Sequence, residues 1–461
     1  MSKDTTLSEF TEQQQDDPTS GEELREDGFL TLSRDWSVST LSEVAKKGGL
    51  VDGDWIESDD MDEDGEIQLV QLGHIGQGRF KGEPNRFITK EFAEKEDCTV
   101  LSEGDLLISR MQEPILRCCL LPSFEKESVM AVDIARLQES EGWNRQFLKY
   151  VLNSRPIWKQ GIAWASGTTR KRISRKNMEK LRLPTPSLSE QQKIATILYT
   201  IDRAIEKTEQ IIEQVDKLKS GVVQQVFTEG TRDHETYQNT KSGKAPEEWE
   251  LTRFEEVITD TRYGTNTKSN TESDGYPTLR IPNIVNKRVT VDDLKHTPLS
   301  EDEIERLKLA DGDILVIRTN GNPDYVGRCA TFDERDEPFV FASYLIRVRV
   351  DKSRVRPAYV REFLNSRRGR SEMAGWIRSS AGNYNLSVGA MEKFQIPIPS
   401  LEEQDEMVEK ITEVGRTIQT NQQYCNELQR LKRGLMQDLL SGTVRTTDTK
   451  IEVPDEIAQH G

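Results

Sequence analysis

The sequence predicts an α+β protein in which two duplicated α/β domains are separated by two long helices that form an intramolecular antiparallel coiled coil. The first observation is a repeat. Pro186–Gln191 returns as Pro399–Gln404, and the copies stay in register as far as Leu218–Gly221 and Leu431–Gly434. The second is the regular spacing of apolar residues after each copy, and the third is the mixture of strand-like and helical stretches before it. Because solenoid units repeat every 20 to 50 residues or so, this longer repeat indicates two domains.

Changes in composition along the 461 residues set the domain boundaries. A chain of this length favours about three domains of roughly 150 residues, and two domains with two helices agree with that expectation. A polar, proline-containing stretch between the helices is typical of a linker. The predicted segments are an acidic disordered tail (1–28), a first domain (29–187), a first long helix (188–230), a linker (231–248), a second domain (249–400), a second long helix (401–442) and a C-terminal tail (443–461).

Each domain mixes strands and helices. Short apolar runs are typical of buried strands, and apolar residues at helical spacing indicate helices. The runs predict strands over 68–72, 105–109, 131–135, 313–318 and 343–350, and the helical patterns predict helices over 144–153 and 357–366. The mixture predicts an α+β domain in both copies.

Each long helix begins after a proline-rich stop. Ser187 and Ser400 can cap the two helices, because Glu190 and Glu403 follow at the third position, as in a capping box. Beyond the caps, apolar residues advance by alternating steps of four and three, the a/d seam of a coiled coil. The predicted seam residues are Ile194, Leu198, Ile201, Ile205, Ile212, Val215, Met407, Ile411, Val414, Ile418, Leu428 and Leu435.

The seam carries matched polar residues. Thr208 in the first helix corresponds to Asn421 in the second, and Lys219 corresponds to Lys432. A polar layer that fixes the register of two paired helices explains this match, and a polar patch that bends each helix explains it equally well. In both cases the helices pair within one molecule, and about 40 residues at 1.5 Å each give a rod of roughly 60 Å.

The chain is acidic, with 63 basic and 80 acidic side chains and a formal net charge of −17. Acid gathers in the N-terminal tail and in turns such as Asp59–Asp64, whereas bases gather at Arg170–Lys176, so the total does not exclude a nucleic-acid partner. Surface carboxylate suits a salt-rich cytoplasm, because molar salt shortens the screening length to about 3 Å, and it predicts a halophilic source. Acidic tails without a specific role are the alternative, which accounts for residues 1–27.

The composition also bounds the compartment. The sequence contains no run of about 18 apolar residues, as a transmembrane helix would require. The acidic N-terminus is the opposite of a signal peptide, so the sequence predicts a cytoplasmic protein. Five cysteines without a C-x-x-C pair, with only four histidines, predict buried thiols and no metal site.

No catalytic motif is present. Asn322–Tyr325 resembles the Asn-Pro-Pro-Tyr loop of amino-methyltransferases, but it lacks the second proline and no glycine-rich loop precedes it. A turn explains it better. His74 to Gly78 lie in a glycine-rich stretch whose order does not match a dinucleotide fingerprint. The sequence therefore favours a binding protein over an enzyme.

The loops before the two long helices have the chemistry of recognition. Thr168, Thr169, Arg170, Lys171 and Arg172 supply donors and charges after the first domain, and Arg378, Asn383, Tyr384 and Asn385 occupy the equivalent place in the second. Arginine suits guanine and asparagine suits adenine, so unlike loops on like scaffolds predict unlike base sequences. A basic loop that only solvates the surface is the alternative. Weaker candidates for DNA contact are Gln77, Arg79, Arg110, Arg318 and Asn320.

Together these features resemble the specificity subunit of type I restriction-modification systems. The resemblance rests on Leu183–Gln191 and Ile396–Gln404, each a proline-rich phrase that opens a long helix, and it covers nearly the whole chain. Trp249–Phe254 and Gly312–Leu315 are similar to other phrases of this family.

The resemblance implies a non-catalytic DNA reader with two target-recognition domains, each reading half of a bipartite asymmetric site. It also implies two modification subunits that carry S-adenosylmethionine and methylate adenine N6, and restriction subunits that use ATP and Mg²⁺. No cofactor is expected on this chain itself. The acidic tail and the charge of −17 are unusual for a DNA reader, so phosphate neutralisation is expected from the partners or from host salt.

Two other readings stay open. A coiled-coil scaffold that spaces two protein-binding domains would have the same rod, but it would not require loops that differ while their scaffolds agree. A degenerate methyltransferase using Asn322–Tyr325 would bind S-adenosylmethionine.

Overall fold

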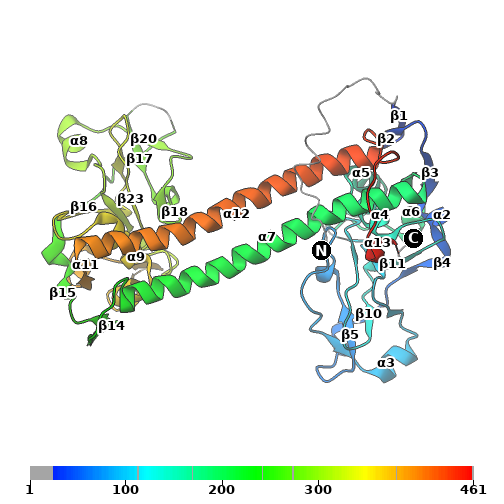
Figure 1. Ribbon diagram of the computed structural model, residues 1–461, viewed down its shortest axis with the longest axis horizontal. Helices are drawn as coiled ribbons and strands as arrows, with labels where there is room; N and C mark the ends of the chain where they lie inside the picture. Colours follow the sequence, from blue (N-terminus) through cyan, green and yellow to red (C-terminus); the bar gives the residue numbers. More distant parts are fainter. Residues whose placement is uncertain are drawn as a thin grey trace. The chain divides into compact units, whose positions relative to one another are not determined.

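The computed structural model describes residues 24–111, 114–168, 170–240, 242–271, 275–380 and 382–458 (Figure 1). Contacts divide the chain into unit 1, which comprises Met1–Thr208 with Tyr424–Gly461, and unit 2, which comprises Glu209–Gln423. The long helices α7 (Leu188–Glu229) and α12 (Leu401–Ser441) both cross these boundaries, so each unit contains part of both. Residues 1–23 of the expected acidic tail lie outside the described residues.

Unit 1 mixes short strands and helices around two four-stranded sheets. Its elements are β1 (Leu24–Asp27), β2 (Leu30–Ser33), β3 (Ser37–Thr40), α2 (Leu41–Val44), β4 (Ala45–Asp52), η1 (Ser58–Asp60), β5 (Ile67–Val70), η2 (Leu72–His74), β6 (Phe87–Ile88), α3 (Lys90–Lys95), β7 (Val100–Leu101), β8 (Leu106–Ser109), β9 (Cys118–Leu120), β10 (Ser128–Met130), β11 (Ile134–Glu139), α4 (Arg145–Leu152), α5 (Arg155–Trp164), α6 (Arg175–Met178), β12 (Arg182–Thr185) and α13 (Asp455–Ala458). The sheets have the orders β4-β11-β8-β9 and β6-β5-β10-β7, and β1-β2 and β12-β3 form separate pairs.

The main core of unit 1 lies between a sheet, α4 and the two long helices. All four residues of β8 are buried, as expected for an apolar strand covered on both faces. Asn144 caps α4 by accepting a hydrogen bond from the N–H of Phe147 at 3.0 Å, which places Phe147 in the core. Leu198 of α7 and Leu439 of α12 belong to the same cluster, so both long helices complete the core.

Unit 2 repeats this plan with a larger sheet. Its elements are β13 (Tyr237–Thr240), β14 (Gly243–Pro246), β15 (Glu250–Arg253), η3 (Phe254–Val257), β16 (Ile258–Tyr263), β17 (Tyr276–Leu279), η4 (Ile281–Asn283), β18 (Ile284–Val285), β19 (Arg288–Val289), β20 (Lys295–Thr297), α8 (Glu301–Leu307), β21 (Ile314–Ile317), β22 (Thr319–Asn320), β23 (Cys329–Thr331), β24 (Val340–Phe341), β25 (Leu345–Val350), α9 (Pro357–Asn365), α10 (Arg367–Ala374), β26 (Arg378–Ser380), β27 (Asn383–Asn385), α11 (Val388–Met391) and β28 (Gln395–Ile398). The sheets have the orders β16-β25-β21-β23-β19-β18, β20-β17-β24 and β22-β27-β26, with β15-β28 and β13-β14 as pairs.

The core of unit 2 is built, like that of unit 1, from a sheet, a short helix and the two long helices. β21 is fully buried, and α9 contributes Tyr359 and Phe363. Phe227 of α7 and Met407 of α12 join this cluster. The two units therefore share a plan in which a sheet and one amphipathic helix pack on the long-helix pair, which confirms the duplicated α/β domains.

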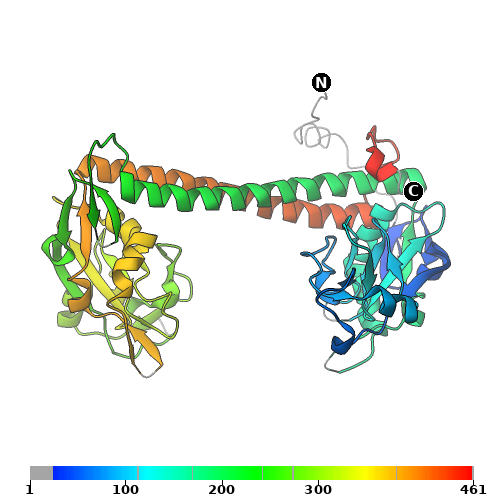
Figure 2. The ribbon, with the colours of Figure 1, turned by 90° about the horizontal axis from the view of Figure 1, so that it is seen from below.

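The two long helices run antiparallel, because the start of α7 packs with the end of α12 in unit 1 and the end of α7 packs with the start of α12 in unit 2. Within each unit the helices lie side by side (Figure 2). Every predicted seam residue is buried or half-buried. Apolar residues off the seam are more exposed, at 58% for Leu218 and 40% for Leu431. The predicted antiparallel helix pair is confirmed.

Both helices end at a glycine. Gly230 and Gly442 have φ of +82° and +73°, a left-handed conformation that glycine adopts without strain and that ends a helix. The structure places the helix ends at Glu229 and Ser441, one residue earlier than the predicted segments.

The expected tails and linker contain structure. Leu24–Asp27, assigned to the disordered tail, forms β1 and pairs with β2. The linker contains the β13-β14 pair, and the C-terminal tail contains α13, because backbone groups in these segments find partners on their own unit. β11 begins at Ile134, since residues 131–133 turn between it and β10.

Candidate nucleic-acid interface

Five predicted contact residues meet in unit 2 on one small sheet. β27, which carries Asn383, Tyr384 and Asn385, lies in the middle. On one side Asn320 of β22 pairs with Tyr384, and on the other side Arg378 of β26 pairs with Asn385. The sheet therefore brings β22 together with the adjacent strands β26 and β27, which lie more than fifty residues further along the sequence.

The small sheet is tied to the domain by its backbone. The N–H of Leu386 donates to the carbonyl of Arg318 at 2.8 Å, and Leu386 itself is buried. Arg378 and Asn383 are exposed, whereas Asn320, Tyr384 and Asn385 are half-buried. Because the anchor is buried and Asn383 is exposed, the side-chain amide of Asn383 is able to bond a ligand.

Aromatic residues that the sequence pattern did not single out lie beside this sheet. The guanidinium carbon of Arg318 lies 4.5 Å from the ring centroid of Tyr263, a cation–π contact. Tyr263 and Tyr344 are 39% and 57% exposed, and the N–H of Arg318 donates to the carbonyl of Tyr344 at 3.0 Å. The sequence offers little signal for this pair, because Tyr263 ends β16 whereas Tyr344 lies in the turn before β25, far along the chain.

Unit 1 builds a reduced form of the same arrangement. Arg172 makes antiparallel bridges to Ser166 on one side and to Met111 on the other, as β27 does between β26 and β22. The side chain of Arg172 also pairs with Asp133 at 2.9 Å. Thr168 and Arg170 are exposed, Lys171 is half-buried, and Thr169 lies outside the described residues.

Arg110, expected at the DNA surface, is a buried structural residue. Only 5% of it is exposed, and its guanidinium lies 2.9 Å from Asp52 and donates to the carbonyl of Ile173 at 3.3 Å. Burial lowers the pKa of Arg110 from its usual value, and Asp52 opposes that effect. Arg110 therefore braces the loop that presents Arg172 and is not itself available to a base.

Gln77 and Arg79 lie on a tight turn of unit 1. Gly78, between them, has φ of +82° and donates its N–H to the carbonyl of Cys118 at 2.9 Å. The N–H of Gly76 donates to the carbonyl of Arg79 at 3.0 Å, which closes the turn. Both predicted residues are exposed on this anchored turn.

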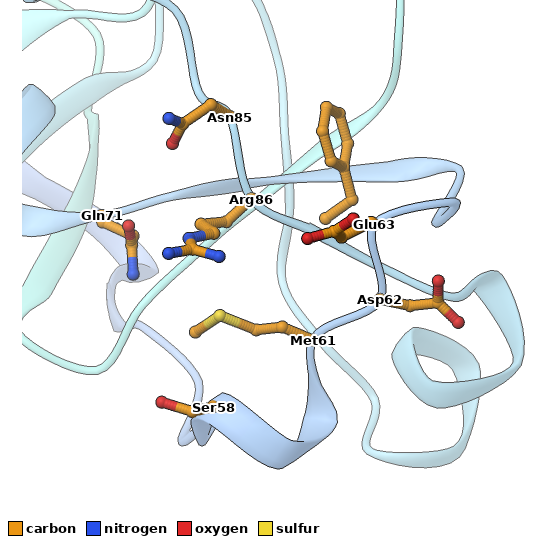
Figure 3. Close-up of a pocket in the computed structure, with 8 residues that line it drawn as sticks. Ser58, Met61, Asp62, Glu63, Gln71, Asn85 and Arg86 are labelled. Carbon is orange, nitrogen blue, oxygen red and sulfur yellow. The ribbon is translucent and has the colours of Figure 1, made fainter.

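Unit 1 also contains a cavity of about 540 Å³ that sequence reasoning missed. Figure 3 shows Arg86 extending toward Gln71, with Met61 beside it. Asp62 and Glu63 line the cavity as well, so its wall carries both signs of charge. A mixed wall of this kind suits hydrogen bonding to a neutral polar group better than contact with a phosphate.

The repeated Glu-Gln at the start of each long helix joins helix to domain. Gln191 accepts a hydrogen bond from the N–H of Asn144 at 2.9 Å, and Gln404 accepts one from the N–H of Arg356 at 2.8 Å. The amide groups of the two glutamines also donate to domain carbonyls. The repeat therefore marks a structural joint, a role that the sequence pattern did not reveal.

Two further findings concern membrane spans and metal sites among the described residues. No helix among them is long and apolar enough to cross a membrane. Nor does this part of the chain bring three or more histidine, cysteine or acidic side chains together as a metal site would require.

Comparisons with known proteins agree with the duplication. The family model for the type I restriction modification DNA specificity domain matches twice, over residues 33–217 and 246–430. The type I restriction enzyme EcoKI specificity subunit of Escherichia coli (strain K12) is 26% identical over 308 residues, which cover 64% of this chain and 64% of that protein. The MjaVIII specificity subunit of Methanocaldococcus jannaschii is 26% identical over 286 residues, which cover 60% of this chain and 66% of that protein.

The chain spans slightly less than two thirds of the length of these two relatives. A solved chain from a type I R-M system, described for its complex assembly and conformational transition, shares the fold with a TM-score of 0.57 and 15% identity. That likeness covers 90% of this chain and 99% of the other. Since the two family matches cover most of the residues and coincide with the two copies of the domain and its helix, the chain belongs to the family of type I restriction-modification specificity proteins.

Proposed function

We propose that this chain is the sequence-specific DNA-binding subunit of a type I restriction-modification complex and reads a bipartite, asymmetric site. One observation carries the proposal: the two units present the same three-segment platform with unlike side chains. In unit 2 the platform carries Asn383 and Asn385 on β27. In unit 1 it is reduced to the bridges of Arg172 with Ser166 and Met111, and Arg170 lies in the loop just before Arg172.

The side-chain chemistry supports two different half-sites. The amide of asparagine can bond adenine through N6 and N7, and the guanidinium of arginine can bond guanine through O6 and N7. Asn383 and Arg170 are both exposed and are the best placed for such contacts. The tyrosines Tyr263 and Tyr344 offer apolar contact beside the amides of unit 2.

The chain directs chemistry that its partners perform. In this proposal two modification subunits bring S-adenosylmethionine and methylate adenine N6, and restriction subunits bring ATP and Mg²⁺, while this chain binds no cofactor. The complex acts on double-stranded DNA in the cytoplasm. With a net charge of −17, the chain leaves most phosphate neutralisation to its partners or to high salt.

The test is to co-express the chain with its neighbouring methyltransferase subunit and to map N6-methyladenine by single-molecule sequencing. A bipartite motif that is methylated only when the chain is present supports the proposal. Exchange of residues 249–400 for another such domain serves as the matched control and should change one half of the motif. An active methyltransferase without any chain-dependent motif would instead favour the scaffold reading.

A further inference from the structure

Unit 2 contains a second cavity, of about 470 Å³, lined by the last part of α7, the start of α10 and the turn between β18 and β19. Three cationic side chains line it: Lys219 of α7, Lys287 of the turn and Arg367 of α10. These cations gather on a chain whose net charge is −17. The lining of the cavity thus holds three cationic side chains and one acidic side chain, Asp216.

Several polar groups of the cavity are already engaged. Lys287 pairs with the buried Glu362 at 2.5 Å. The side-chain amide of Asn365 donates to the carbonyls of Cys329 and Arg361, and the hydroxyl of Ser366 donates to the carbonyl of Phe363. These contacts hold Lys287, Asn365 and Ser366 to other groups of the domain.

Lys219 and Arg367 remain. Within the described part of the chain, neither side chain has a hydrogen-bond or ion-pair partner, and Gln224 offers a further amide from the same helix. Asp216 also lines the cavity, but among these residues it pairs with neither cation. Two cations from different elements thus face one space without a counter-charge bound to either.

The duplicated position in unit 1 shows what is missing. Lys432, the counterpart of Lys219, lies 2.5 Å from Asp202, which also accepts a hydrogen bond from the hydroxyl of Tyr150 at 2.8 Å. The counterpart of Asp202 in unit 2 is Gly415. A Cβ atom at Gly415 would lie 3.6 Å from the ammonium nitrogen of Lys219, so a carboxylate there would reach it.

A half-buried ammonium group without its carboxylate is destabilised, and a bound anion would relieve that cost. We propose that this cavity binds a phosphate group through Lys219 and Arg367. An ammonium, a guanidinium fork and an amide together supply more donors than the two oxygens of a carboxylate accept, whereas a phosphate presents three or four oxygens. The remaining volume accommodates what the phosphate is attached to, either a free nucleotide or a nucleic-acid backbone.

The test measures binding of pyrophosphate to the full chain by isothermal titration calorimetry. Lys219→Ala and Arg367→Ala should each weaken binding by about tenfold or more, as expected for loss of a charge-assisted bond. Gly415→Asp should do the same, because it supplies the carboxylate that Lys432 has in unit 1. Lys207→Ala removes an equal charge from an exposed site on α7 and should leave the affinity unchanged.

Competition identifies the source of the phosphate. Displacement of pyrophosphate by ATP but not by duplex DNA assigns a free nucleotide. Displacement by a DNA duplex of about 20 base pairs assigns a nucleic-acid backbone. Absence of binding, or equal affinity in the three cavity variants and wild type, would overturn the proposal. The proposal would also be overturned if citrate bound as tightly as pyrophosphate and lost the same affinity in the cavity variants, since the site would then select carboxylates. None of these substitutions touches the β22-β27-β26 sheet, so the outcome is independent of base reading.

Discussion

The indole nitrogen of Trp249 donates a hydrogen bond to the carboxylate of Glu403 at 3.0 Å, across 154 residues of sequence. Trp36 donates to Glu190 at 3.2 Å across the same separation. Each tryptophan directly precedes a strand that pairs with the last strand before a long helix, β3 with β12 and β15 with β28, and each glutamate lies in the first turn of that helix. The pair therefore closes each domain onto the helix that follows it.

Besides its tryptophan, each of the two carboxylates bonds a second side chain, and this second partner differs between the units. Glu190 forms a bidentate pair with Arg445, which follows α12, whereas Glu403 bonds the ring of His234, which follows α7, at 3.0 Å. Arginine stays charged at all ordinary pH values, but histidine titrates near neutrality. This partner is therefore a permanent charge in unit 1 and a titratable ring in unit 2.

Trp249→Phe should destabilise unit 2 by at least about 1.5–3 kcal/mol, because it removes a hydrogen bond to a buried charged group and also leaves a void where the larger indole packed. Urea unfolding followed by fluorescence measures the change. Trp55→Phe is the matched control, since Trp55 is 70% exposed and bonds Glu57 at the surface, and it should cost less than about 0.5 kcal/mol. Equal losses in the two variants would contradict a special role for Glu403.

The stability of unit 2 should fall as the pH rises above neutrality. Burial lowers the pKa of His234, but hydrogen bonds to Glu403 and Glu248 outweigh it and raise that pKa above its usual value. The contribution of the histidine is therefore complete below about pH 6.5 and is lost as the pH rises through the raised pKa. Unfolding free energies measured from pH 5.5 to about 9 should show this decline in the wild type and a flatter profile in His234→Gln. Parallel profiles would refute the assignment.

Arg110→Ala should cost about 1–3 kcal/mol of stability, since it removes the buried guanidinium that bonds the carbonyl of Ile173, while Asp52 is partly exposed and can be hydrated. It should leave the preference among DNA sequences unchanged. Thermal unfolding and competition binding of the complex measure the two effects separately. A changed base preference with unchanged stability would return Arg110 to the recognition surface.

Asn383→Ala should weaken binding to one half-site by about 1–3 kcal/mol and leave the other half unaffected. Arg170→Ala should do the same for the opposite half. Competition between duplexes that differ in one half at a time checks both variants within the assembled complex. Loss at both halves from a single substitution would show that the units do not read independently.

Insertion of one heptad after Thr208 and one after Gln423 should lengthen each helix by about 10 Å, or roughly three base pairs of DNA. The insertion keeps the seam in register because it adds a whole repeat. The spacer of the methylated motif should grow while both half-sites stay the same. An unchanged spacer in an active complex would mean that the helices do not set the distance.

Local sequence patterns predicted the helices well and the site only in part. The heptads of α7 and α12 depend on residues three and four positions apart, so their seam is readable from the sequence. Arg110 and Arg170 look alike in the sequence, and what separates them is Asp52, which a different strand brings to Arg110. Tyr263 and Tyr344 both contact Arg318 only because β16 and β21 pair with the two edges of β25, an arrangement that no local pattern encodes.

The division of the chain also orders its folding during synthesis. Unit 2 is one continuous stretch, so it can close as soon as residue 423 has left the ribosome. Unit 1 is interrupted, and its core needs Leu439, Leu440 and Ile457 against Ile194 and Leu198. The first domain to be translated is therefore the last to be completed, and until then its apolar helix face remains open to chaperones or to premature association with another nascent chain.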